Sequence, residues 1–261
     1  MSAAPTPGTL YLVPTPLDHG CPLQAPLTDA LPQGTIEVAA RLSHWISENA
    51  RSTRAFLKRV AALVPLAQPL QAQHIQQLPH AIHKQGDHRR AGTWDARPLL
   101  APALQGHDLG LVSEAGMPAV ADPGSSVVGA AHDLGIEVRP LVGPVSMLLA
   151  LAASGLNGQS FAFVGYLPQE ASRRATRLRE LEAWAQQSGQ SQMFIETPYR
   201  NAALLQALLQ QLRPDTRLAV CSGLTLAQQR CTSLRVADWR LRSAALTADL
   251  SAQPAVFAIG P

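Results

Sequence analysis

Apolar and polar positions along the chain follow two alternating patterns, short β-rich runs and longer segments with helical periodicity. In the first half, the β-rich runs are residues 9–13, 36–39, 109–113 and 138–141. Helical patterns follow at residues 51–60, 125–134 and 145–154. Strands that alternate with helices are typical of a mainly parallel sheet with crossover helices. The first half therefore predicts an α/β fold, in which ligands bind at the turns that follow the carboxyl ends of the strands.

A run of turn residues, Gly-Leu-Asn-Gly at 155–158, separates this half from a second α/β pattern. The second set of strands is expected at residues 161–166, 192–195, 217–221, 229–233 and 255–259, and its helices at residues 173–187, 201–212 and 236–244. Residues 65–104 have weak periodicity and predict an irregular stretch. The chain is thus expected to form two consecutive α/β domains, residues 1–156 and residues 157–261.

Composition fits a globular protein, with 46% hydrophobic and 15% charged residues in a chain of 261. The net charge of +3 allows RNA or another anionic partner without indicating one. Cys21, Cys221 and Cys231 are odd in number and form no C-x-x-C pair, which favours a reducing, cytoplasmic compartment. Residues 1–8 lack the features of a secretion signal, and the longest apolar stretch, 141–156, is interrupted by glycine and proline. No membrane partner is expected.

Several common chemical signatures are missing from the sequence. No G-x-G-x-x-G, P-loop or G-x-S-x-G pattern is present, which disfavours a dinucleotide fold, a P-loop enzyme and a typical hydrolase. His74, His80, His83 and His88 lie close together in sequence, but they have no H-E-x-x-H context. Ordinary surface or core histidines are the simpler interpretation, so no metal site is expected.

The segment 111–124 is the most informative part of the chain. A buried strand opens there into a loop with two glycines, two prolines and two carboxylates. Glycine lets a ligand approach the backbone closely, and proline fixes the loop without adding a donor. Asp122 and Pro123 also fit a helix start, with Asp122 as N-cap. Both a structural and a functional role for Asp122 stay open.

Six short segments, in order along the chain, resemble one family of proteins. They are GTLYLVPTP at 8–16, ENARST at 48–53, VSEAGMP with DPG at 112–124, PLVGP at 140–144, FVGYLP at 163–168 and IETPYR at 195–200. The resemblance is to the tetrapyrrole methylase superfamily, in the form of its 16S ribosomal RNA cytidine-2′-O-methyltransferases. Each segment is short, but their order and spacing together are specific.

This resemblance implies a two-domain α/β fold, a homodimer, and S-adenosyl-L-methionine bound in the cleft between the domains. The cofactor residues that it implies in the first domain are Pro14, Ser113, Glu114, Ala115, Gly116, Met117, Val120, Gly143, Val145 and Ser146. Those implied in the second domain are Glu196, Leu224 and Ala255. Core packing is the competing interpretation for Val120, Val145 and Leu224.

Methyl transfer from a sulfonium requires alignment and the exclusion of water rather than a metal or a covalent nucleophile. If the acceptor is a ribose hydroxyl, a base must take its proton, and Glu48, Glu114 and Asp122 lie in suitable loops. Glu114 is the first choice for this role, with Asp122 as a further catalytic candidate. Arg51 is a candidate for binding a phosphate or the acceptor, because its guanidinium offers several donors in a fixed geometry.

The acceptor side departs from the family pattern more than the cofactor loops do. The departures are Asp18-His19-Gly20 for G-N-L, Asn49 for aspartate, Met117 for threonine and Ala252-Gln253-Pro254 for K-G-E. Ribosomal RNA methylation at a ribose 2′-oxygen is the leading hypothesis, and two alternatives stay open. The alternatives are methylation of a tetrapyrrole, another small molecule or a protein, and binding of S-adenosyl-L-methionine without catalysis.

Basic residues form three clusters that could contact RNA phosphates. These are Arg51, Arg54, Lys58 and Arg59; His88, Arg89 and Arg90; and Arg173, Arg174, Arg177 and Arg179. The last cluster has no aromatic residue between its arginines, and its neighbours Glu180 and Glu182 also fit a solvated helix face. RNA of the small ribosomal subunit is the expected partner on the first hypothesis.

Overall fold

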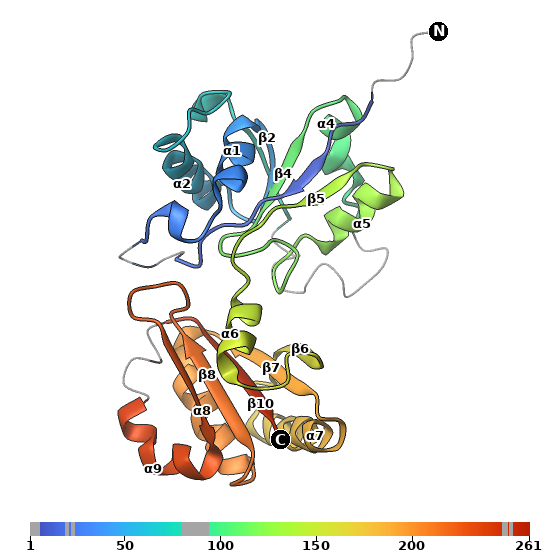
Figure 1. The fold of residues 1–261 in the computed structure, drawn as a ribbon. Helices are drawn as coiled ribbons and strands as arrows, with labels where there is room; N and C mark the ends of the chain where they lie inside the picture. Colours follow the sequence, from blue (N-terminus) through green and yellow to red (C-terminus); the bar gives the residue numbers. More distant parts are fainter. Residues whose placement is uncertain (1–5, 19–20, 22–23, 80–93, 247–249, 251–252) are drawn as a thin grey trace. The chain divides into compact units, whose positions relative to one another are not determined.

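The computed structural model describes residues 6–18, 21, 24–79, 94–246, 250 and 253–261 (Figure 1). The chain divides into two compact units, residues 1–145 and residues 146–261, and each is described by itself. Within the described residues, no helix is long and apolar enough to cross a membrane.

The first unit is built on a sheet of five parallel strands in the order β3-β2-β4-β1-β5. The strands are β1 (Leu10–Leu12), β2 (His44–Ser47), β3 (His74–Gln77), β4 (Leu109–Val112) and β5 (Val138–Pro140). β1 and β4 are direct neighbours at the centre, with Leu10 paired to Leu109. All carboxyl ends therefore meet at the same edge of the sheet.

Helices cover both faces of this sheet. α1 (Gln33–Arg41) and α2 (Ala50–Ala61) share one core with Trp45, whereas α5 (Ser125–Asp133) and α4 (Ala101–Leu104) share another with Ile46. Among its described residues, the unit also has short 3₁₀ helices at Leu27–Asp29, Leu70–Ala72 and Arg97–Leu100. The connections that leave β1 and β4 run in opposite directions, to β2 and to β5, and so pass on opposite faces of the sheet. This is a topological switch point, where open parallel sheets bind ligands.

Two expectations for this unit need correction. Residues 36–39 belong to α1 rather than to a strand, because buried Ile36, Ala39 and Ala40 follow helical spacing and Pro32 precedes the helix as N-cap. The strands β2 and β3 were not expected. Each has only four residues, and β3 lies at the sheet edge with mostly exposed polar side chains, so neither carries a clear apolar pattern.

The second unit contains a sheet in the order β6-β7-β10-β8-β9. Its strands are β6 (Phe161–Tyr166), β7 (Ser191–Glu196), β8 (Arg217–Ser222), β9 (Arg230–Arg235) and β10 (Ala255–Gly260). Only β6 and β7 are parallel, so the expectation of a mainly parallel sheet is wrong for this unit. Residues 223–229, which join β8 to β9, are too few for the crossover helix that parallel neighbours need.

The helices of this unit also lie on two faces. α7 (Ala171–Ser188), α8 (Asn201–Gln211) and α9 (Val236–Leu246) pack on one core that includes Phe194 and Phe257. α6 (Ser146–Ser154) contacts β8, β9 and β10 on the face opposite this core. There the Cys221 thiol donates a hydrogen bond to the Ala150 carbonyl. α6 therefore groups with the second unit, and the turn residues at 155–158 follow it within that unit.

Candidate active site

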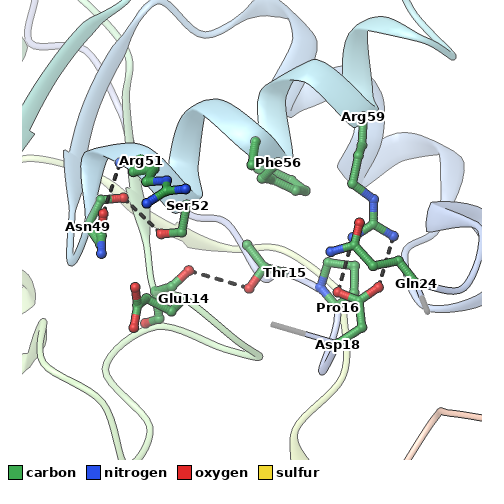
Figure 2. Close-up of a pocket in the computed structure, with 12 residues that line it drawn as sticks. Thr15, Pro16, Asp18, Gln24, Asn49, Arg51, Ser52, Phe56, Arg59 and Glu114 are labelled. Atoms are coloured by element: carbon green, nitrogen blue, oxygen red, sulfur yellow. Dashed lines mark hydrogen bonds and ion pairs between the residues drawn. The ribbon is translucent and has the colours of Figure 1, made fainter. Parts of the chain in front are cut away.

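The switch point of the first unit holds a pocket of about 390 Å³. Its wall comes from the segment after β1, one side of α2 with its N-cap, and the two residues after β4 (Figure 2). The lining residues are Thr15, Pro16, Asp18, Gln24, Asn49, Arg51, Ser52, Ala55, Phe56, Arg59, Ser113 and Glu114. This volume lies in the range of small-molecule sites. Of the residues expected from the sequence, the pocket brings together Arg51, Ser113 and Glu114.

The start of α2 is fixed by its N-cap and by a bond to β2. The Asn49 side chain accepts a hydrogen bond from the backbone N–H of Arg51 at 2.9 Å, so asparagine caps this helix as aspartate would. Ser47 and Thr53 share a buried hydroxyl hydrogen bond of 2.6 Å, which ties β2 to α2. The Arg51 guanidinium has no partner among the residues that the structure describes, and it lines the pocket. It is free to bind an anion there.

An ion pair forms the other end of the pocket. Asp18 and Arg59 approach each other with two N···O distances of 3.0 Å, and Arg59 also donates to the Ala25 carbonyl at 2.7 Å (Figure 2). Asp18 is buried and Arg59 is largely buried, so removing either side chain would leave the charge of the other without compensation. Asp18 stood out in the sequence only as a departure from the family pattern, and Arg59 only as one member of a basic cluster.

Three carboxylates gather beside the pocket at the ends of β2 and β4. Glu48 accepts a hydrogen bond from the backbone N–H of Glu114 at 3.1 Å, which holds the two segments together. Burial, and after it the negative charges of Glu48 and Glu114, together raise the pKa of Asp122 to about 7, while the neighbouring Ser113 side chain opposes the shift. Asp122 therefore changes its protonation state near neutral pH, as a general base must.

The interpretation of Asp122 as a helix cap is wrong. α5 begins at Ser125 and its N-cap is Gly124, which has a φ of 138° and no side-chain cap. Asp122 lies two residues before that cap, inside the loop.

The loop from Ser113 to Gly124 has an unusual backbone. Ala119 and Ala121 have φ values of 64° and 67°, which cost roughly 1–3 kcal/mol each for residues other than glycine. The loop is held by a bridge to the segment after β1, in which Thr15 and Gly116 exchange two backbone hydrogen bonds of 3.0 Å. Val120, between the two alanines, is 39% exposed, so core packing does not account for it. Strain of this kind is found at binding sites, where the surroundings fix one loop shape.

The loop after β5 packs directly on the loop after β1. A Cβ atom on Gly143 would lie 2.3 Å from Cγ of Pro14, so only glycine permits this approach. The neighbouring Val142 carbonyl accepts a hydrogen bond from the Thr35 hydroxyl at 2.8 Å, which anchors the loop to α1. The loops that carry Pro14, Gly116 and Gly143 are therefore one packed assembly within the first unit. Val145 is the last residue of this unit, and Ser146 begins α6 of the other.

The second unit places its three expected residues at one end of its sheet. Ala255 is the cross-strand partner of Glu196 on β7 and of Ser222 on β8, and Leu224 follows β8 by two residues. The Glu196 carboxylate is buried and already bonded, because it accepts from Arg200 at 2.7 Å and from the Thr197 N–H at 2.8 Å. Its first role in this structure is to hold Arg200.

The described residues contain no cluster of histidine, cysteine and carboxylate side chains that is arranged to hold a metal ion. His74 stacks on His44, with ring centroids 4.7 Å apart, at the amino ends of β2 and β3. His80, His83 and His88 lie outside the described residues, as do His19, Arg89 and Arg90.

Fold and site together define an α/β protein with a ligand pocket at the switch point of a five-stranded parallel sheet. Residues 44–238 match the family model of the tetrapyrrole (corrin/porphyrin) methylases, which is most of the chain. The chain belongs to the tetrapyrrole methylase family.

Relatives of known name match most of this chain but less of their own length. Proteins named "Ribosomal RNA small subunit methyltransferase I" are 34% identical in Mesorhizobium japonicum and 35% identical in Micromonospora olivasterospora. These alignments cover 85% and 84% of this chain, and 66% and 60% of the relatives. The chain thus spans less than two thirds of the length of either relative.

Solved structures support the same fold at low sequence identity. A uroporphyrin-III-C-methyltransferase from Thermus thermophilus has a TM-score of 0.51 at 19% identity, and the methyltransferase CobJ has 0.53 at 18%. Each alignment covers 97% of this chain and 94% of the other. The expected two-sheet α/β architecture is confirmed.

Proposed function

We propose that this protein is a methyltransferase that uses S-adenosyl-L-methionine to methylate small-subunit ribosomal RNA at a ribose 2′-oxygen. The observation that carries the proposal is the partly buried Asp122 carboxyl beside Glu48 and Glu114, with its pKa raised to about 7, in the strained loop beside the pocket. The family membership and the name of the related proteins support the choice of reaction and of acceptor.

The loops of the first unit fit such a cofactor. Met117 and Val120 offer partly exposed apolar surface, and Gly116, Ala119 and Ala121 have left-handed backbone, which gives the loop its turns. When bound, the cofactor supplies an electrophilic methyl group on a sulfonium. Pro14, Ser113, Glu114, Ala115, Gly143, Val145 and Ser146 remain proposed cofactor residues, together with Glu196, Leu224 and Ala255 of the second unit.

The residues around the pocket divide the remaining work. Arg51 binds a phosphate of the acceptor, since its guanidinium has no partner among the described residues and lines the pocket. The amino end of α2, which favours anions, lines the same pocket. Asp122 takes the proton from the attacking hydroxyl, and Glu48 and Glu114 keep its pKa high enough for that. Asp18 and Arg59 hold the far end of the pocket in shape.

Binding of S-adenosyl-L-methionine is expected to be directly measurable. Calorimetry should give saturable heat, and ligand at a hundredfold excess over Kd should stabilise the protein by about 2.7 kcal/mol. For a chain of this size, that is a rise in Tm of at least about 5 °C. If millimolar ligand produces no heat and no shift in Tm, the protein does not bind this cofactor.

The acceptor is tested with labelled cofactor and three substrates: undermodified small ribosomal subunits, naked ribosomal RNA and cell extract. Label in RNA, located at a ribose by nuclease digestion, is the expected result. Label confined to a small-molecule or protein fraction would show a different acceptor. Cofactor binding without any label would favour the non-catalytic hypothesis.

Replacing Arg51 with alanine should raise the KM for ribosomal subunits about tenfold and leave kcat nearly unchanged, because a phosphate contact contributes to ground-state and transition-state binding alike. The salt dependence of binding should fall by the share of about one phosphate. The matched control is Arg54→Ala, one turn further along α2, where the side chain bonds only to the Ala50 carbonyl and does not line the pocket. Equal effects of the two changes would remove Arg51 from the site.

A homodimer, as the family resemblance implies, and a cytoplasmic location, as the unpaired cysteines Cys21, Cys221 and Cys231 favour, complete the proposal. Light scattering on the purified protein should give twice the chain mass of 27.8 kDa. A mass equal to one chain would exclude the dimer at that concentration.

A further inference from the structure

Two exposed tyrosines flank an arginine at the carboxyl ends of β6 and β7. Tyr199 is 72% exposed and Tyr166 is 59% exposed, which is unusual for such large rings. The Arg200 guanidinium lies over the Tyr199 ring at 5.1 Å from its centroid. Tyr166 is paired with Ile195 near the end of β7, four residues before Tyr199. We refer to Tyr166, Tyr199 and Arg200 as the aromatic platform.

The platform is held in place by its own contacts. Glu196 accepts a hydrogen bond from the Arg200 guanidinium at 2.7 Å, and its carboxylate is only 4% exposed. This hydrogen bond raises the pKa of Arg200, and the nearby hydroxyls of Tyr199 and Tyr166 add to the shift. Arg200 is therefore charged and fixed beneath one face of Tyr199. The outer surface of the ring stays accessible.

The fold also brings arginines next to the platform. The first turn of α7, five residues after Tyr166, carries Arg173 and Arg174. Positive charge there opposes the helix dipole, so it does not stabilise the helix through that dipole. Arg173 is exposed, and it has no partner among the described residues.

The later arginines of α7 behave differently. Arg177 pairs with Glu180 at 3.1 Å, and Arg179 donates to Gln211 at 3.0 Å. These two arginines fit the alternative interpretation from the sequence, a solvated helix face. Of the two arginines near the platform, Arg173 has no partner among the described residues, and Arg174 donates only to a backbone carbonyl, that of Gln169, at 3.1 Å. The arginines further along α7 are bonded to other side chains.

We propose that the aromatic platform binds single-stranded RNA, with a base stacked on Tyr199, a second base on Tyr166, and the intervening phosphates on Arg173 and Arg174. The proposal rests on the function proposed above only for its choice of RNA as substrate. Aromatic rings and arginine planes bind unpaired bases by stacking, with little dependence on sequence. Bases within a duplex are already stacked on each other, so the platform discriminates against double strands.

This surface differs from the pocket of the first unit in what it would recognise. The pocket offers arginines and carboxylates around a concave volume, suited to one nucleotide that reacts. The platform offers exposed aromatic rings and the exposed cation of Arg173, suited to neighbouring nucleotides that do not react. It would hold the strand and leave the chemistry to the other unit.

The test is binding of a fluorescein-labelled, mixed-sequence 12-nucleotide RNA to the full chain, followed by anisotropy. Tyr199→Ala should weaken binding about tenfold, since one stacked base is lost. Tyr199→Phe should bind as the wild type does, because the stacking surface is retained. The blunt duplex of the same sequence should bind more weakly and should not respond to either change.

The matched control is Trp184→Ala, which removes another exposed aromatic side chain, 53% exposed, from the far part of α7. It should leave RNA binding unchanged. Arg173→Ala should lower the salt dependence by about one phosphate, whereas Arg179→Ala should not. Thermal melts of all variants check that each is folded.

The outcomes separate this inference from the proposed function. If Tyr199→Ala and Trp184→Ala bind RNA equally well, the platform is wrong, whether or not the wild type methylates ribosomal subunits. If Tyr199→Ala loses RNA affinity while calorimetry with S-adenosyl-L-methionine is unchanged, the platform is supported. That support stands even if no methyl transfer to RNA is found, in which case the proposed reaction fails alone.

Discussion

Replacing Asp122 with asparagine is expected to lower the rate of methyl transfer by a factor of about 10²–10⁴, the usual contribution of a general base. Asparagine keeps the size and the neutral hydrogen-bonding groups of a protonated aspartate, but it cannot take a proton. In the wild type, kcat/KM should rise with pH through about 7, as Asp122 loses its proton, and then level off. In the variant this rise should disappear.

The same change should make the protein more stable at alkaline pH. The pKa of Asp122 is about 7 in the folded chain, against about 3.9 in an unfolded one. Between these values the unfolded chain has released a proton that the folded chain still holds, so the free energy of unfolding falls as pH rises. The loss is complete above pH 7 and amounts to at most about 4 kcal/mol. The Asp122→Asn variant should not show this loss of stability.

Rate and stability therefore move in opposite directions at pH 8, which a merely structural aspartate would not do. Urea unfolding at pH 5 and pH 8, together with single-turnover methyl transfer, measures both. The control is Asp133→Asn at the end of α5, an exposed position that should change neither. If Asp122→Asn keeps its rate and Glu114→Gln loses it, Glu114 is the base, as the loop positions first suggested.

The sequence predicted the helices and strands of the second half of the chain well, because long apolar runs there match long elements. It failed at 36–39, where a short apolar run has the same composition in a helix as in a strand. It also failed on strand direction. Direction depends on connection length and on which strand β10 joins, and a pattern of apolar positions contains neither.

The sequence predicted which loops form the candidate site, but it did not predict how their side chains are arranged in space. The motifs placed Arg51, Ser113 and Glu114 at turns after strands, and the parallel sheet then brought them to one pocket. Asp18, Arg59 and Phe56 complete that pocket, but only the fold places them there. The raised pKa of Asp122 is likewise a product of folding, because it requires burial and two carboxylates from separate segments. The aromatic platform shows the same limit, since Tyr166 and Tyr199 are distant in sequence from each other.

Replacing Gly143 with alanine is expected to destabilise the first unit by about 1–3 kcal/mol and to weaken S-adenosyl-L-methionine binding at least about tenfold. The added Cβ would lie 2.3 Å from Cγ and 2.5 Å from Cβ of Pro14, and 3.1 Å from a methyl group of Leu31. The proline ring cannot rotate away, so the loop after β1 or the loop after β5 must shift. Both loops are proposed to contact the cofactor.

Gly129→Ala is the matched control, because it adds the same methyl group where no atom lies within 4 Å. Gly129 is inside α5, so the change should stabilise the protein by about 0.5–1 kcal/mol through the helix preference of alanine and leave cofactor binding unchanged. Urea melts and calorimetry on both variants separate packing from binding. If Gly143→Ala unfolds like the wild type, the contact with Pro14 is not a close one. If it is destabilised and yet binds the cofactor normally, the two loops support each other without forming the cofactor site.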